Sequence, residues 1–163
     1  MKLLKTMALA ISLLVVSQVA FSQKVTKIGI KEVKEITNSS EDKLYVVNFW
    51  ATWCAPCIAE LPAFETAFNK YEPKGVEFSM ISLDFPNHLE KKVIPFVERK
   101  SMPQPVFLLD YGKDQDWYNM VEEKWDGAIP VTLIFNNAKK QRKVFVGKVG
   151  LEKLDETIQS FLN

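Results

Sequence analysis

The chain has 163 residues with a formal net charge of +1, and 47% of its residues are hydrophobic and 25% charged. This length suits one domain, and the composition is that of a globular protein rather than of a disordered or fibrous one. Because acidic and basic residues balance and form no basic stripe, the sequence argues against nucleic acid as a partner.

Residues 1–22 have the pattern of a secretory signal peptide. Two lysines precede an apolar run over residues 7–16, and an Ala-Phe-Ser site with small outer residues ends the segment. We expect cleavage there, which leaves one mature domain over residues 23–163 in an exported compartment, with the periplasm as the expected location. An uncleaved membrane anchor is the alternative, but the apolar run is short for a bilayer span of about 20 residues.

Apolar periodicity and turn residues predict alternating strands and helices along the rest of the chain. In chain order these are a weak strand with a short helix (24–36), a strand (44–50), a long helix (55–71), a strand (76–83), a helix kinked at Pro95 (87–100), a short extended segment (105–110), a helix (114–125), a hairpin of two strands (131–135 and 143–149) and a final helix after Gly150. The strands on either side of the long helix should be parallel, and the hairpin antiparallel.

The only two cysteines, Cys54 and Cys57, stand between the apolar strand 44–50 and the long helix. A structural disulfide here would close a very short loop and so remove little entropy from the unfolded chain. Zinc needs about four Cys or His ligands, and the chain offers two Cys and one His. Haem attachment would require His directly after the second cysteine, where Ile58 stands. A thiol–disulfide redox site remains the favoured interpretation.

Around the two cysteines, the sequence resembles a known family. Residues 48–57, Asn-Phe-Trp-Ala-Thr-Trp-Cys-Ala-Pro-Cys, are similar to the active-site segment of thioredoxin-like proteins. Ile129-Pro130 resembles the cis-proline segment that faces this site, and Gly147 resembles the glycine that lets a partner approach. Glu60, three residues after the second cysteine, is similar to the glutamate of exported thiol–disulfide reductases of the TlpA and ResA type, which include proteins serving cytochrome c maturation.

The resemblance implies an α/β, thioredoxin-like fold with a central mixed β-sheet flanked by helices. It also implies an insertion before the cis-proline strand, for which residues 84–125 are long enough. The start of the chain departs from the pattern, because a well-formed N-terminal β-hairpin is hard to recognise there.

The position of each cysteine predicts its role. Cys54 begins the helix, where free N–H groups and the positive end of the helix dipole favour a thiolate, so we expect it to be the exposed attacking sulfur. Cys57 lies one turn further and is the expected resolving thiol. Glu60 shares the face of Cys57, and a partly buried carboxyl with a raised pKa would accept the proton of that thiol. A solvated surface glutamate is the alternative.

Substrate contacts are expected around the dithiol from Trp53, Ala55 and Pro56, and from the backbone of Ile129 before a cis Pro130. These features predict an enzyme that reduces protein disulfides through a redox-active Cys54–Cys57 disulfide, without a cofactor or metal. The expected partners are protein disulfides and a membrane-bound or exported thiol reductant, and the protein is expected to be a monomer.

One alternative to a reductase stays open, and two others are disfavoured. A disulfide oxidase or isomerase would use the same residues, and a non-enzymatic thioredoxin-like binding module would have no use for the intact dithiol. A peroxidase is disfavoured, because the T-x-x-C pattern is absent and Thr52 stands only two residues before Cys54.

Overall fold

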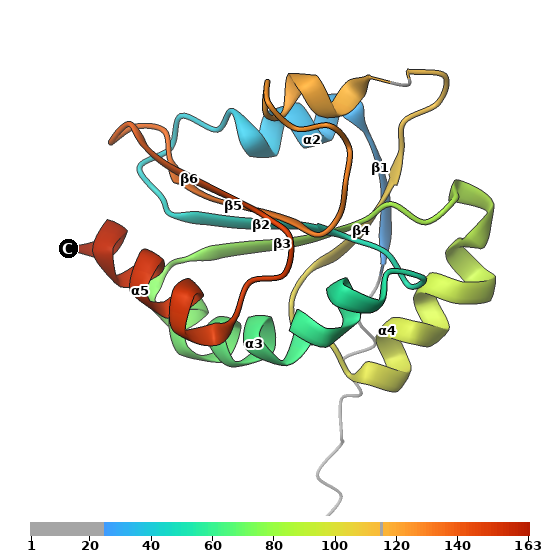
Figure 1. Cartoon of the computed structure of the whole chain (residues 1–163), viewed down its shortest axis with the longest axis horizontal. Helices are drawn as coiled ribbons and strands as arrows, with labels where there is room; N and C mark the ends of the chain where they lie inside the picture. Colours follow the sequence, from blue (N-terminus) through green and yellow to red (C-terminus); the bar gives the residue numbers. More distant parts are fainter. Residues whose placement is uncertain (1–24, 115) are drawn as a thin grey trace, which may run out of the picture.

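The computed structural model describes residues 25–114 and 116–163 (Figure 1). The predicted signal peptide, residues 1–22, lies outside the described residues. Within the two described ranges, no helix has the length and apolar character needed to cross a membrane.

The centre of the molecule is a six-stranded mixed sheet with the order β1-β4-β3-β2-β5-β6. Its strands are β1 (Thr26–Gly29), β2 (Tyr45–Trp50), β3 (Glu77–Ser82), β4 (Val106–Asp110), β5 (Val131–Asn136) and β6 (Gln141–Val146). The first four are parallel, whereas β5 runs antiparallel to β2 and β6 antiparallel to β5. The predicted parallel pair and antiparallel hairpin are therefore confirmed, as is the mixed sheet.

Helices cover both faces of the sheet (Figure 1). One face carries α3 (Ala55–Tyr71), α4 (Ile94–Lys100) and α5 (Leu151–Leu162). The other carries α2 (Ile30–Thr37) and the short 3₁₀ turn η5 (Trp117–Met120). Further short turns are η2 (Glu72–Lys74), η3 (Pro86–His88) and the π-helical η4 (Leu89–Val93).

The central strand β2 separates two hydrophobic cores. Because successive side chains of a strand point to opposite faces, Trp50 packs with α3 and α5 on one side, while Phe49 packs against Trp117 and Trp125 on the other. Trp50 is fully buried and contacts Phe96, so it is a core residue rather than part of the rim of the site.

The predicted helix over residues 114–125 is wrong, because among the described residues of this range, 114 and 116–125, only η5 is helical. The apolar residues whose spacing suggested a helix are buried without one: Trp117 and Trp125 pack edge to face with ring centroids 5.3 Å apart. The side chain of Asp114 accepts a hydrogen bond from the N–H of Asp116, and such local bonds compete with helical ones.

Two smaller predictions also need correction. The helix expected over residues 87–100 is divided into η4 and α4, and Pro95 lies in the first turn of α4, where its missing N–H is not needed, rather than at a kink within one helix. The second hairpin strand is β6, which begins at Gln141 and ends at Val146, earlier than expected at both ends. Within the expected insertion, β4 is a full member of the sheet, between β1 and β3.

Candidate active site

The turn between β2 and α3 presents Cys54 at the start of the helix. Cys54 is the N-cap of α3 in an extended conformation, and its Sγ accepts a hydrogen bond from the N–H of Cys57 at 3.3 Å. Pro56 occupies the first turn of the helix, which loses no hydrogen bond there. The free N–H groups and the positive end of the helix dipole therefore point at the sulfur of Cys54.

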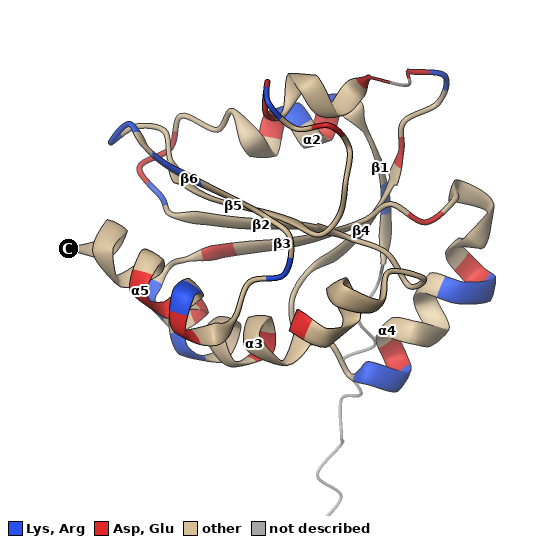
Figure 2. Ribbon diagram, viewed as in Figure 1, with Lys and Arg blue, Asp and Glu red and all other residues tan. Residues whose placement is uncertain are grey.

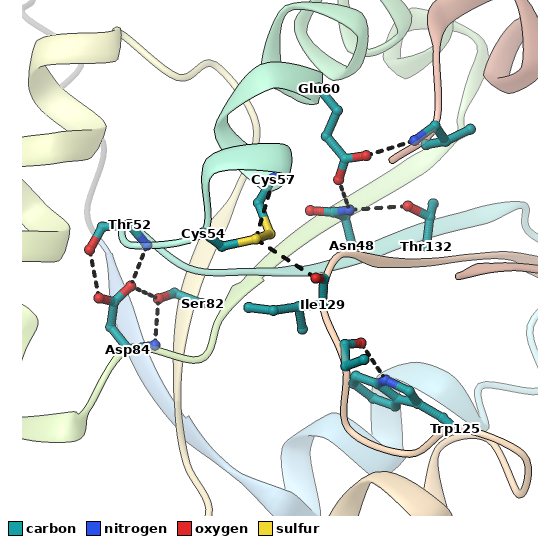
Figure 3. Close-up of a disulfide and its surroundings, with 12 residues drawn as sticks. Asn48, Thr52, Cys54, Cys57, Glu60, Ser82, Asp84, Trp125, Ile129 and Thr132 are labelled. Carbon is teal, nitrogen blue, oxygen red and sulfur yellow. Dashed lines mark hydrogen bonds between the residues drawn. A yellow bond between two sulfur atoms is a disulfide. The ribbon is translucent and has the colours of Figure 1, made fainter. Parts of the chain in front are cut away.

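Cys54 and Cys57 form a disulfide (Figure 3). Cys57 is fully buried and Cys54 is 5% exposed, so the order of exposure is as predicted, but Cys54 is much less exposed than expected. The residues between and before the cysteines form the open surface of the site: Trp53 is 62% exposed, and Ala55 and Pro56 are exposed.

The segment before β5 faces the disulfide. The Ile129–Pro130 peptide bond is cis, as predicted, and the carbonyl oxygen of Ile129 lies 3.8 Å from the Sγ of Cys54 (Figure 3). The N–H of Gly147 donates to the carbonyl of Pro130 at 2.8 Å. Gly147 has φ +88°, a conformation that favours glycine, and a Cβ there would meet no atom within 4 Å. The backbone opposite the cysteines is thus fixed and uncrowded.

Glu60 is 1% exposed and lies in a hydrogen-bonded network one turn beyond Cys57 (Figure 3). Its Oε1 accepts from the Nδ2 of Asn48, which also donates to Thr132, and its Oε2 accepts from the N–H of Val149, each of the two Glu60 bonds being 2.8 Å. Burial raises the pKa of Glu60, and the two hydrogen bonds and the charge of Lys148 oppose this only in part. The predicted burial and raised pKa are confirmed.

Asp84 is a second buried carboxyl near the disulfide, and the sequence analysis missed it. It follows β3 and is fully buried. It accepts hydrogen bonds from the N–H and the hydroxyl of Thr52 at 2.8 and 2.6 Å, and from the hydroxyl of Ser82 at 2.8 Å (Figure 3). Asp84 thereby holds the backbone two residues before Cys54. The signal was available, because the carboxyl ends of adjacent parallel strands meet at one edge of a sheet.

No group of three or more His, Cys, Asp or Glu side chains that could hold a metal ion occurs within residues 25–114 and 116–163. Next to the disulfide, the described residues provide the two cysteines and two buried carboxyls, Glu60 and Asp84. A thiolate at a helix N-terminus is a nucleophile toward disulfides, and a second thiol one turn away can complete the exchange.

Comparison with solved structures identifies the fold as thioredoxin-like. A thioredoxin-related protein from Neisseria meningitidis superposes with a TM-score of 0.61 at 24% identity, covering 76% of this chain and 88% of that one. StoA from Bacillus subtilis superposes with a TM-score of 0.55 at 22% identity, covering 74% and 86%.

Curated relatives are named for thiol–disulfide oxidoreduction. The thiol-disulfide oxidoreductase ResA of Oceanobacillus iheyensis is 28% identical over 160 residues, which cover 90% of this chain and 79% of the relative. ResA of Halalkalibacterium halodurans is also 28% identical, but the chain spans only 62% of its length. The model of the AhpC/TSA family matches residues 16–144. With its thioredoxin-like fold and its similarity to ResA-type proteins, this chain belongs to the AhpC/TSA family.

Proposed function

We propose that the protein is a thiol–disulfide oxidoreductase that reduces disulfides of other proteins in an exported compartment. The observation that carries the proposal is the juxtaposition of two groups: the Cys54–Cys57 pair at the start of α3 and the cis Ile129–Pro130 backbone that faces it at 3.8 Å. The named ResA relatives and the family match support the same class of reaction.

In the proposed reaction, two electrons pass from the dithiol to the substrate. The thiolate of Cys54 attacks one sulfur of the substrate disulfide, forms a mixed disulfide and releases the other substrate sulfur as a thiolate, which takes up a proton. The thiolate of Cys57 then attacks the Sγ of Cys54. The Cys54–Cys57 disulfide forms, the bond to the substrate breaks, and the second substrate thiol leaves.

We assign Glu60 to the second step, in which Cys57 must lose its proton. In the disulfide state each Glu60 oxygen is held by a donor, Asn48 on one side and Val149 on the other. Its pKa is raised by burial, so it is a better proton acceptor than an ordinary glutamate near neutral pH. We propose that it takes the Cys57 proton, directly or through one water molecule.

The substrate segment is proposed to bind in an extended conformation along the backbone of Ile129, with Trp53, Ala55 and Pro56 forming the opposite wall. These three residues are exposed beside a disulfide that is itself almost covered. A partner must therefore place its sulfur in a narrow gap between the helix start and the cis-proline segment, which favours a flexible or unfolded region of a protein.

The direction of electron flow is testable by redox titration. Ala55 and Pro56 place neither a charge nor a histidine between the sulfurs, so nothing there strongly stabilises the thiolate. We expect a reduction potential nearer to about −270 mV, as in thioredoxin, than to about −120 mV, as in DsbA. A potential above roughly −180 mV would instead indicate an oxidase or isomerase.

The roles of the two thiols are testable by alkylation of the reduced protein. Cys54 should react with a brief iodoacetamide pulse much faster than Cys57, because Cys57 is the more deeply buried and Cys54 stands at the helix start. Mass mapping of the two peptides measures this ratio, and equal or inverted labelling would contradict the assignment. If the parent protein reduces insulin no faster than Cys54→Ser does, the protein is a binding module instead of an enzyme.

The cellular setting is a narrower proposal. Export and cleavage of residues 1–22, a membrane-bound or exported thiol reductant as electron donor, a monomeric state and a role in cytochrome c maturation all rest on the sequence pattern and the family resemblance. A Cys57→Ser variant, which cannot resolve the mixed disulfide, should trap the substrate covalently in cells. Identification of the trapped protein tests the proposed substrates, including cytochrome c maturation, and the processed N-terminus of the variant tests cleavage of residues 1–22.

A further inference from the structure

A hollow of about 280 Å³ opens next to the disulfide, on the side of the aromatic loop. Its lining includes four aromatic residues, one carboxylate and one aliphatic side chain: Trp53, Tyr111, Trp117, Tyr118, Asp126 and Ile129. Trp53 directly precedes Cys54, and the carbonyl of Ile129 lies 3.8 Å from the Cys54 sulfur. A side chain close to the reacting cysteine of a substrate can therefore reach the hollow, since a residue spans only about 3.5 Å of extended chain.

Ring stacking and one hydrogen bond hold the walls of the hollow in place. Trp117, at 5% exposure, forms its floor, and the ring of Tyr111 stacks on it at 6.2 Å. The Nε1 of Trp125 donates to the carbonyl of Ala128 at 2.7 Å, which anchors the loop that leads to the site (Figure 3). Gly127 has φ +86°, and a Cβ there would lie 3.1 Å from the ring of Tyr118. The aromatic wall thus depends on glycine at this position.

The surroundings of the hollow are acidic. Residues 110–126 contain six acidic and two basic residues, and Figure 2 marks acidic residues in red on the loops that enter and leave the turn η5. Two of these carboxylates are compensated from outside the segment, Asp110 by Lys27 and Glu122 by Arg142. Asp126 accepts a hydrogen bond from the N–H of Ala128 with one oxygen, and no described residue is shown bound to the other.

Burial of the Tyr118 ring together with Asp116 and Asp126 raises the pKa of its phenol. The part of this shift that comes from Asp116 and Asp126 agrees with a negative potential at the aromatic wall. The Asp126 carboxylate disfavours an apolar side chain in the hollow, because such a side chain would remove water from the carboxylate without replacing the lost hydrogen bonds. A cation would pair with the carboxylate and lie against the faces of tyrosine and tryptophan rings, which attract positive charge.

We propose that this hollow is a specificity subsite for a cationic side chain of the substrate. The side chain belongs to a lysine or arginine within two residues of the reacting cysteine. This inference rests on the proposed function. The subsite selects among disulfide substrates by charge complementarity, whereas the dithiol itself reacts with any disulfide that reaches it. The preferred substrate is therefore a flexible polypeptide whose cysteine has a basic neighbour.

The test uses symmetric disulfide dimers of an alanine-based peptide with one cysteine. One arginine is placed one or two residues from the cysteine, or five residues away, and norleucine replaces arginine in the reference peptide. At the best near position, the full mature protein in its reduced form should react about 10-fold faster with arginine than with norleucine, and a distant arginine should give less than about a 2-fold advantage. Equal rates for near and distant arginine would overturn the subsite.

Two matched variants locate the effect. Asp126→Asn removes the charge but keeps the acceptor for Ala128, and it should bring the arginine-to-norleucine ratio close to 1. Asp114→Asn changes the net charge equally and keeps the corresponding bond to the N–H of Asp116, so the ratio should stay unchanged. An equal loss in both variants would show a general field instead of a subsite. Failure of the parent protein to reduce even the norleucine peptide would instead refute the proposed function itself, and the inference with it.

Discussion

Two buried carboxyls flank the disulfide, and they are held in different ways. Asp84 accepts three hydrogen bonds, all from Thr52 and Ser82 at the ends of neighbouring strands. Glu60 accepts two, one per oxygen, from Asn48 and from Val149, which is 89 residues away in sequence. Burial alone therefore does not define the role of a carboxyl. The donors of Asp84 fix the turn before Cys54, whereas burial raises the pKa of Glu60.

The largest expected difference is in stability. Asp84→Ala should lower the free energy of unfolding by about 3 kcal/mol, because it leaves the half-buried N–H of Thr52 without its acceptor and disrupts the hydroxyl partners. Glu60→Ala leaves the buried N–H of Val149 without its acceptor, but Asn48 keeps its bond to Thr132 and a group that burial disfavours in its charged form is removed, so the cost should be about 1–2 kcal/mol.

Urea unfolding of the oxidised proteins measures both values. Glu65→Ala, which removes an exposed carboxyl from the same helix, is the control and should stay within about 0.5 kcal/mol of the parent. The proposed structural role of Asp84 is contradicted if Glu60→Ala proves the more costly of the two substitutions.

The next effect is kinetic. Glu60→Gln keeps the size of the side chain and removes the proton acceptor, so resolution of the mixed disulfide should slow by about 10- to 100-fold. The apparent pKa of the thiol pair should also fall, because a negative charge near Cys57 is lost. Single-turnover rates and thiolate absorbance of the reduced protein give these two quantities.

Asp84→Asn is the matched control for this kinetic effect. It also neutralises a buried carboxyl near the disulfide, and its amide can keep three bonds if the hydroxyl of Thr52 accepts instead of donating. The resolution rate of Asp84→Asn should therefore stay within about 3-fold of the parent, well below what general acid–base catalysis contributes. Equal slowing in the two variants would assign the effect to charge alone and remove the special role of Glu60.

The smallest effect is the dependence of stability on pH. The pKa of Glu60 is raised in the folded protein above its ordinary value of 4.5, so the folded state keeps this proton to a higher pH than the unfolded state. The resulting stabilisation is fully present below about pH 4.5 and is lost as the pH rises through the folded pKa. Glu60→Gln lacks this group and should lack this decline.

The difference in unfolding free energy between the parent and Glu60→Gln, measured by urea unfolding from pH 4 to 8, isolates Glu60. Other carboxyls contribute equally to both proteins; Asp155, for example, has its pKa lowered chiefly by the hydrogen bond from Lys70. A difference that does not change with pH would mean that Glu60 titrates normally.

The part of the site formed by residues close together in the chain could be predicted from the sequence. The strand, turn and helix around Cys54 and Cys57 were predicted because apolar runs and the proline in the first turn specify them over short distances. The burial of Glu60 was predicted from its spacing of three residues from Cys57 on an apolar helix face. The cis bond before Pro130 came from the family resemblance instead of from local chemistry.

The long-range part could not be predicted in the same way. The partners of Glu60 come from β2 and from the segment before α5, and a single sequence does not show which distant residues meet. The aromatic residues of the segment 114–125 have helical spacing, yet Trp117 and Trp125 bury themselves more fully by packing on each other and on Phe49. Tertiary packing outweighed the local helical pattern there.

Ile129 packs against both hydrophobic cores, one on each side of the sheet. The cysteines belong to the core of α3 and α5, whereas Trp117 and Trp125 belong to the other. The proposed proton chemistry and the proposed substrate choice thus belong to opposite layers, which meet at the residue whose backbone faces the disulfide. The aromatic layer can diverge between related proteins to suit new partners while the reacting layer stays unaltered, as long as Ile129 keeps its place.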